Sequence, residues 1–134
     1  MSPKTSSKIG KIRRYLNIVE SLKAECEEKF NEDPIYQGAL LHYLYLISDS
    51  VVSLSQMVLK ERKIDYAQSY YESIDLLGEH GLIPREFAYD FAKIASMRNF
   101  LAHDYEKVDY KKICQDVLGK LSDVEKFLQM VEKL

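Results

Sequence analysis

The sequence predicts an all-α fold, an antiparallel bundle of four to five helices. Apolar residues recur at spacings of three and four along most of the chain. The 5 glycines and 3 prolines fall mostly where these stretches begin or end. The length of 134 residues is enough for a single hydrophobic core but not for two. We therefore expect a single domain over residues 1–134, with a flexible tail at residues 1–6.

Composition and charge exclude several classes of protein. The net charge is −2, so any binding to nucleic acid must come from a local basic patch. Cys26 and Cys114 lie far apart, each within a helical pattern. Their spacing suggests neither a disulfide framework nor a metal site, and it fits a reducing cytosol. Met1–Lys8 lacks the apolar core of a signal peptide, and the run Ala39–Ile47 is too short and too polar to span a bilayer. We therefore expect a cytoplasmic protein without a membrane segment.

The first helix is expected over Ser7–Phe30, where the apolar residues follow an amphipathic spacing. Basic residues gather around its start, and they form either a solvated face or part of a surface that faces RNA: Lys4, Lys8, Lys11, Arg13 and Arg14.

The second helix is expected to begin at Pro34, because Asp33 followed by proline is typical of an N-cap and first helical position. It should run to about Lys60. Residues 40–58 leave almost no polar face, which predicts bundle packing on one side and a subunit contact on another. His42 and the tyrosines of this helix (Tyr36, Tyr43 and Tyr45) are expected to be packed residues, not metal ligands or a base-stacking platform.

Three further helices are expected after this point. Asp65 should cap a helix over about Tyr66–Glu79, and Gly81 fits a left-handed C-terminal stop. Pro84 should lie in the first turn of a helix over Pro84–Ala102. Asp109 should cap the last helix, whose apolar residues alternate at four and three like a coiled-coil seam: Tyr110, Cys114, Val117, Leu121, Val124, Leu128 and Val131.

The stretch Met97–Tyr110 (MRNFLAHDYEKVDY) combines the residues that suggest chemistry. Arg98 would lie in the middle of an apolar arc, which is costly unless the guanidinium is paired or faces a polar cleft. We hypothesise that Asp49, which interrupts the apolar second helix, is its partner. His103 would lie ~140° around an ideal helix from Arg98. Either the helix ends between these residues, or a second copy of the chain brings its own pair alongside.

Arginine and histidine together suit phosphoryl transfer without a metal or other cofactor, and we expect none. Histidine exchanges a proton near neutral pH, and arginine holds a phosphate with its planar fork. RNA supplies the 2′-hydroxyl as nucleophile, so cleavage should leave a 2′,3′-cyclic phosphate. Lysines just beyond His103 either contact RNA phosphate or solvate the start of the last helix: Lys107, Lys111 and Lys112.

The pattern Arg98-Asn99-x-x-x-His103-x-Tyr105 resembles the motif of the HepT-like branch of the HEPN superfamily. Asp65–Pro84 resembles the segment that precedes this motif in that branch, and Tyr105–Asp109 the segment that follows it. The resemblance covers most of the chain. It implies a HEPN-like helical bundle that forms a homodimer, with the two motifs meeting at the dimer cleft.

The resemblance also implies a function, an RNase toxin of a prokaryotic toxin–antitoxin pair. Arg98 and His103 would be catalytic and Asn99 supporting. The antitoxin would be a minimal nucleotidyltransferase that transfers AMP from ATP to Tyr105. Two alternatives remain: a non-catalytic helical partner or nucleotide-binding subunit of the nucleotidyltransferase, or a motif that only locks the dimer. Cleavage of RNA in vitro separates the RNase from the non-catalytic partner, and a motif that only locks the dimer predicts that Arg98→Ala dissociates or unfolds it.

Overall fold

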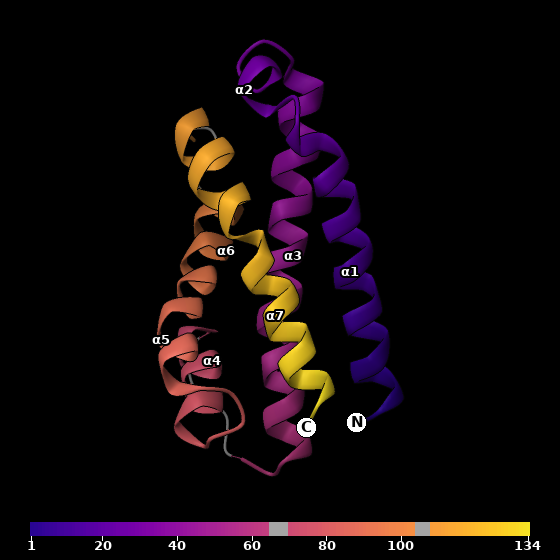
Figure 1. Cartoon of the computed structure of the whole chain (residues 1–134), viewed down its shortest axis with the longest axis vertical. Helices are drawn as coiled ribbons and strands as arrows, with labels where there is room; N and C mark the ends of the chain where they lie inside the picture. Colours follow the sequence, from indigo (N-terminus) through magenta and orange to yellow (C-terminus); the bar gives the residue numbers. More distant parts are fainter. Residues whose placement is uncertain (65–69, 104–107) are drawn as a thin grey trace.

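The fold is known from a computed structural model, which describes residues 1–64, 70–103 and 108–134. These residues form helices joined by turns, without a β-strand, and they confirm the predicted all-α class (Figure 1). The elements in chain order are α1 (Pro3–Lys23), α2 (Cys26–Lys29), α3 (Pro34–Glu61), α4 (Tyr70–Glu79), α5 (Arg85–Phe91), α6 (Lys93–His103), the π-helical turn η2 (Lys112–Val117), the 3₁₀ turn η3 (Leu118–Lys120) and α7 (Leu121–Glu132).

The N-terminal helix begins earlier and ends earlier than expected. The Ser2 hydroxyl accepts a hydrogen bond from the Thr5 amide at 3.2 Å, which caps α1 at Pro3. Residues 3–6, which we assigned to a flexible tail, therefore belong to the first turn of α1. At the other end, a turn separates α1 from the short α2, so the expected helix over Ser7–Phe30 is two helices.

Helix α3 is the central element of the bundle, and α1, α4 and α6 pack against it (Figure 1). Its predicted start is confirmed, because the Asp33 carboxylate accepts hydrogen bonds from the amides of Ile35 and Tyr36 at 3.0 and 3.1 Å. Its buried apolar residues lie at the centre of the core, and they include Leu40, Leu44, Ile47, Val51, Leu54 and Leu59.

The connection after α4 follows the prediction, whereas the next helix differs from it. Gly81 has φ +73°, the left-handed conformation expected at a helix stop. The expected helix over Pro84–Ala102 is divided at Ala92 into α5 and α6, and Pro84 is the residue that precedes α5. The expected cap Asp65 lies outside the described residues.

The last segment is less regular than a single α-helix. The four–three seam holds in α7, where Leu121, Val124, Leu128 and Val131 are buried. In η2 and η3 the buried residues are instead Ile113 and Leu118, five positions apart. Tyr110, Cys114 and Val117 of the predicted seam are only partly buried, but they still pack against the core, so the seam holds in a weaker form along the π turn.

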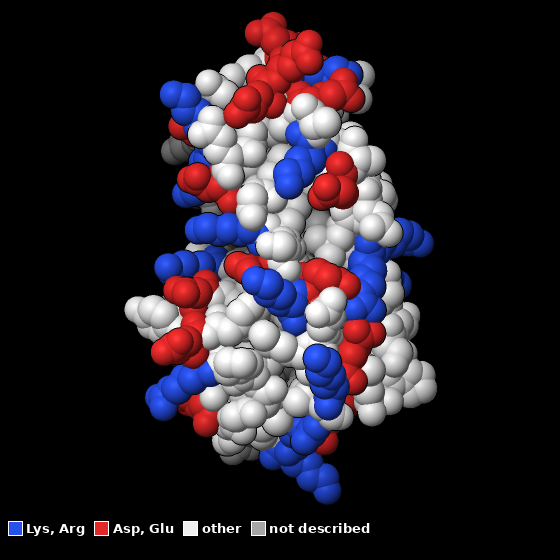
Figure 2. Space-filling model, viewed as in Figure 1, with Lys and Arg blue, Asp and Glu red and all other residues white. Residues whose placement is uncertain are grey.

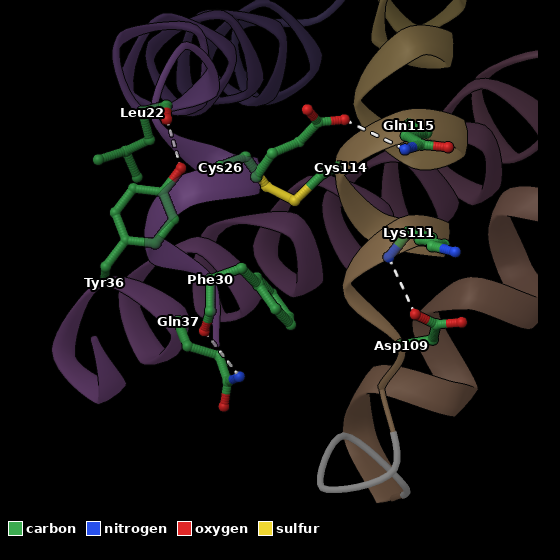
Figure 3. The surroundings of a disulfide bond; sticks show 10 residues. Leu22, Cys26, Phe30, Tyr36, Gln37, Asp109, Lys111, Cys114 and Gln115 are labelled. Atoms are coloured by element: carbon green, nitrogen blue, oxygen red, sulfur yellow. Dashed lines mark hydrogen bonds between the residues drawn. A yellow bond between two sulfur atoms is a disulfide. The ribbon is translucent and has the colours of Figure 1, made fainter. Parts of the chain in front are cut away.

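Cys26 and Cys114 form a disulfide, which corrects our expectation of two separate thiols. Their Cα atoms are 5.6 Å apart although 88 positions separate them in the sequence (Figure 3). The bond joins α2 to η2. The argument from sequence spacing failed because the fold, and not the local pattern, brings these two residues together.

The face formed by α1 and α7 has no single dominant charge. Figure 2 shows acidic and basic side chains interspersed on the face formed by α1 and α7, with acidic atoms gathered at the end occupied by α2. The exposed residues Glu25, Glu27, Glu28 and Glu32 belong to that end. In the part of the chain that the structure describes, no helix is long and apolar enough to cross a membrane.

Candidate functional site

Arg98 is held in a defined position on the face of α6 that packs against α3. Its Nε donates a hydrogen bond to Asp49 Oδ1 on α3 at 3.0 Å, and this contact is also an ion pair. The Arg98 side chain is 18% exposed and that of Asp49 is 43% exposed. The hypothesis that Asp49 partners Arg98 is confirmed. The carboxylate compensates the guanidinium for its partial removal from water.

Two further side chains orient the same guanidinium. The central carbon of the Arg98 guanidinium lies 5.5 Å from the ring centroid of Tyr45, within the range of a cation–π contact. Its Nη1 donates a hydrogen bond to Asn99 Oδ1 at 3.2 Å. Asn99, predicted as a supporting residue, therefore contacts the arginine directly. Tyr45 has a role in this cluster that its predicted place in the core did not suggest.

His103 lies at the exposed end of α6, and Arg98 belongs to the same continuous helix. The helix therefore does not end between the two residues, which removes one of the two alternatives raised by their spacing. On one helix they remain ~140° apart in direction. That a second copy of the chain brings its own pair alongside stays a prediction.

Of the three lysines predicted to contact RNA phosphate, the structure describes Lys111 and Lys112. Lys111 and Lys112 are exposed at the start of the C-terminal segment, where the Lys111 amide donates to Asp109 Oδ1 at 3.0 Å. Lys112 Nζ lies 5.8 Å from the ring centroid of Phe100, so this lysine extends over α6. Lys107 and the predicted modification site Tyr105 lie outside the described residues.

The disulfide fixes the segment that carries these lysines. Figure 3 shows Cys114 bonded to Cys26, with Asp109 and Lys111 on the same segment as Cys114. A hydrogen bond of 3.1 Å from Gln115 Nε2 to Glu27 Oε1 lies beside the bond and joins the same two elements. The chain beyond the motif is therefore tied covalently to α2.

The sequence of α3 contains a spacing that indicates a shared polar face beside the motif. His42, Tyr45 and Asp49 are spaced three and four residues apart, so they share one face of α3. The structure leaves His42 exposed and Tyr45 and Asp49 partly exposed on that face, beside α6. Within residues 1–64, 70–103 and 108–134, no three His, Cys, Asp or Glu side chains form a group that could hold a metal ion.

A comparison with protein-family models matches residues 9–131 to the family described as "Ribonuclease HepT-like". The match spans nearly the whole chain and contains every residue of the site discussed above.

Two curated relatives and a solved structure are similar over most of their length. The mRNA nuclease HepT of Shewanella oneidensis is 21% identical over 126 residues, which cover 94% of each chain. A putative RNase of Archaeoglobus fulgidus is 30% identical over 123 residues, covering 89% of this chain and 91% of that one. The solved structure of the tri-AMPylated Shewanella oneidensis HEPN toxin, in complex with MNT antitoxin, superposes with a TM-score of 0.89 over 100% of both chains, at 20% identity.

Proposed function

The chain belongs to the HepT-like ribonuclease family, and on this basis we propose that it is a metal-independent endoribonuclease toxin. The observation that carries the proposal is the arrangement of the motif residues Arg98 and His103 on α6. Arg98 is half-buried and oriented by Asp49, Tyr45 and Asn99, and His103 is exposed at the end of the same helix. The names of the relatives, an mRNA nuclease and a putative RNase, support the same activity.

The two side chains have complementary tasks in this reaction. The imidazole of His103 takes the proton of the RNA 2′-hydroxyl, and the 2′-oxygen attacks the adjacent phosphorus. The bond from phosphorus to the 5′-oxygen breaks, and a protonated imidazole gives that oxygen a proton. The products are a 2′,3′-cyclic phosphate and a 5′-hydroxyl. The Arg98 guanidinium stabilises the negative charge on the phosphoryl oxygens while these bonds change.

We place this reaction in the cleft of a homodimer. Because α6 is continuous from Lys93 to His103, Arg98 and His103 of one chain face different directions. A twofold arrangement lets the arginine of one copy act with the histidine of the other. We assign contacts with RNA phosphates to Lys111 and Lys112, and their exposure supports this assignment.

We propose a minimal nucleotidyltransferase as antitoxin. The complex of the Shewanella toxin with MNT antitoxin supports this partner, and its AMPylated state supports the chemistry. The phenolic oxygen of Tyr105 would attack the α-phosphorus of ATP, and pyrophosphate would leave. AMP on Tyr105, two residues from His103, adds bulk and a negative phosphate that repel RNA from the cleft.

The Arg98–Asp49 ion pair is also the observation that favours a second candidate, a non-catalytic helical partner of the nucleotidyltransferase. In that role the pair would only stabilise the contact between α3 and α6.

The test compares the purified wild-type chain with His103→Ala on a labelled RNA. We expect the wild type to produce fragments that end in a 2′,3′-cyclic phosphate, and the variant to be slower by about a hundred- to ten-thousandfold. Expression of the wild type alone should arrest growth, whereas His103→Ala should not. A wild type that cleaves no RNA, or equal growth arrest by both chains, contradicts the proposal.

A further inference from the structure

We propose that a pocket between α3 and α6 binds a nucleobase of the RNA, next to the phosphate that Arg98 contacts. This inference rests on the proposed function and adds how the substrate is recognised. The pocket, called here the base pocket, has a volume of about 510 Å³. Residues that line it include Gln37, Gly38, His42, Tyr45, Leu101 and Ala102.

The ring of Tyr45 lies between the base pocket and Arg98 of the proposed cleavage site. Tyr45 lines the pocket, and its ring centroid lies 5.5 Å from the Arg98 guanidinium carbon. Ala102, on the opposite wall, immediately precedes His103. A nucleotide whose phosphate contacts Arg98 therefore has its base within reach of this pocket.

The chemistry of the walls suits a flat heteroaromatic ring. Tyr45 and His42 are on the same face of α3, and both side-chain types stack on RNA bases. Leu101 adds apolar surface. The Gln37 amide lies at the edge of the base pocket and is held by a hydrogen bond of 3.1 Å from its Nε2 to the Phe30 carbonyl oxygen. The volume lies within the range of about 300–1,000 Å³ that is typical of small-ligand sites.

Gly38 gives the pocket its open floor and provides a clean way to test it. A Cβ atom built on Gly38 meets no other atom within 4 Å, so a larger side chain there enters the pocket and not the core. The same holds for Gly10 on α1, outside the pocket. Both glycines are exposed and lie inside long helices. Gly38→Leu and Gly10→Leu are therefore matched variants, of which only the first fills the pocket.

The probe is a fluorescein-labelled 12-nucleotide RNA whose cut site by the wild type is mapped first. Two further RNAs carry an abasic ribose on the 5′ or the 3′ side of the cut phosphate. We expect one of these abasic RNAs to raise the KM of the wild type roughly ten- to hundredfold, because a stacked base is lost. Gly38→Leu should raise the KM for the intact RNA to a similar degree. This variant should therefore have about the same KM for the intact RNA and for the abasic RNA. Gly10→Leu should behave like the wild type.

A second substitution tests stacking without filling the pocket. His42→Ala should raise the KM for intact RNA, and His42→Phe, which keeps a flat ring, should restore it. Binding of the intact RNA to His103→Ala, measured by fluorescence anisotropy, should weaken when Gly38→Leu is added.

Three results overturn the inference. If Gly38→Leu keeps the KM of the wild type and still distinguishes the intact RNA from the abasic RNA, the pocket does not bind a base. A Gly38→Leu chain that is monomeric by light scattering, next to a dimeric wild type, would assign this groove to the subunit contact. A wild type that neither cleaves nor binds the RNA would refute the proposed function itself, which the wild-type control reveals independently of Gly38.

Discussion

Arg98 on α6 donates a hydrogen bond from Nε to Asp49 on α3 across 3.0 Å, and this contact joins the motif to the centre of the bundle. Nε is the side of the guanidinium nearest the backbone. A carboxylate that holds this side directs the planar end of the group, where the fork that recognises phosphate lies. Asp49 is therefore a positioning residue for the arginine.

Asp49→Ala should reduce both stability and activity. We expect a loss of about 1–2 kcal/mol in the free energy of unfolding, because the partner guanidinium is partly buried. RNA cleavage should slow by up to about a hundredfold, since Arg98 loses its orientation. Urea denaturation and initial cleavage rates measure the two effects. Asp90→Ala, which removes an exposed carboxylate of α5, is the control and should change neither.

Asp49→Asn separates the loss of the negative charge from the loss of the hydrogen-bond acceptor. It keeps an oxygen that accepts the Arg98 hydrogen bond, so it should restore most of the cleavage rate. A rate for Asp49→Asn as low as for Asp49→Ala would show that charge, and not orientation, is what Asp49 supplies. Wild-type rates for both variants would remove Asp49 from the account.

Removal of the disulfide should destabilise the chain. The double variant Cys26→Ser/Cys114→Ser should lose about 2–4 kcal/mol in the free energy of unfolding, because the bond closes a long loop in the unfolded chain. Urea denaturation of the oxidised wild type, the reduced wild type and the variant measures this. The reduced wild type should match the variant. Two free thiols in the unreduced wild type, detected by alkylation and mass spectrometry, would contradict the disulfide.

The ion pairs between α1 and α7 predict a dependence of stability on pH. Arg13 Nη2 and Nη1 donate to the two carboxylate oxygens of Glu132 at 2.6 and 2.7 Å, and Arg13 Nε donates to Glu125 Oε1 at 3.0 Å. The hydrogen bonds from Arg13 lower the pKa of Glu132 below its ordinary value of 4.5. The same bonds raise the pKa of Arg13. The stabilisation is therefore complete above about pH 4.5 and is lost as the pH falls through the lowered pKa.

Glu132→Gln should accordingly destabilise the chain at pH 7 by up to about 1 kcal/mol, a small value because the pair is partly solvated. The difference from the wild type should shrink as the pH falls below 4.5 and through the lowered pKa of Glu132, and urea midpoints over a pH series measure it. Glu20→Gln, at an exposed glutamate of α1, is the control. A difference that does not shrink at any acidic pH where the wild type still folds would contradict the role of the Glu132 carboxylate.

Tyr105 is the predicted site of regulation. When the chain is produced together with its antitoxin, its mass should rise by one or more AMP units, and RNA cleavage should be lost. Tyr105→Phe lacks the phenolic oxygen, so its mass should stay unchanged. The same mass shift in Tyr105→Phe would place the modification on another residue, and no shift in the wild type would argue against transfer of AMP.

Local sequence patterns predicted the elements whose causes are local. The N-cap at Asp33, the left-handed Gly81 and the seam of α7 each depend on side chains a few positions apart, and the structure confirms them. The pair of Arg98 with Asp49 was also predictable, because a charged residue on an apolar face of each helix requires a partner.

Features that depend on the whole fold were missed. The break at Ala92 has no proline or glycine to mark it. Along the π turn at η2 the buried residues are not the seam residues, and periodicity extended from α7 cannot show this. The disulfide depends on the approach of α2 to η2, for which a separation of 88 residues carries no information. The base pocket likewise combines two helices whose relative register only the fold provides.

The central claim, an active site built by two copies of the chain, is tested most directly by mixing two inactive variants. Arg98→Gln and His103→Ala, each inactive alone, are refolded together, and the mixed dimer is purified through a tag on one of them. One chain then supplies an intact histidine and the other an intact arginine. The account predicts that the mixed dimer regains RNA cleavage well above either variant alone. A mixed dimer of correct mass that stays as inactive as its parents would contradict it.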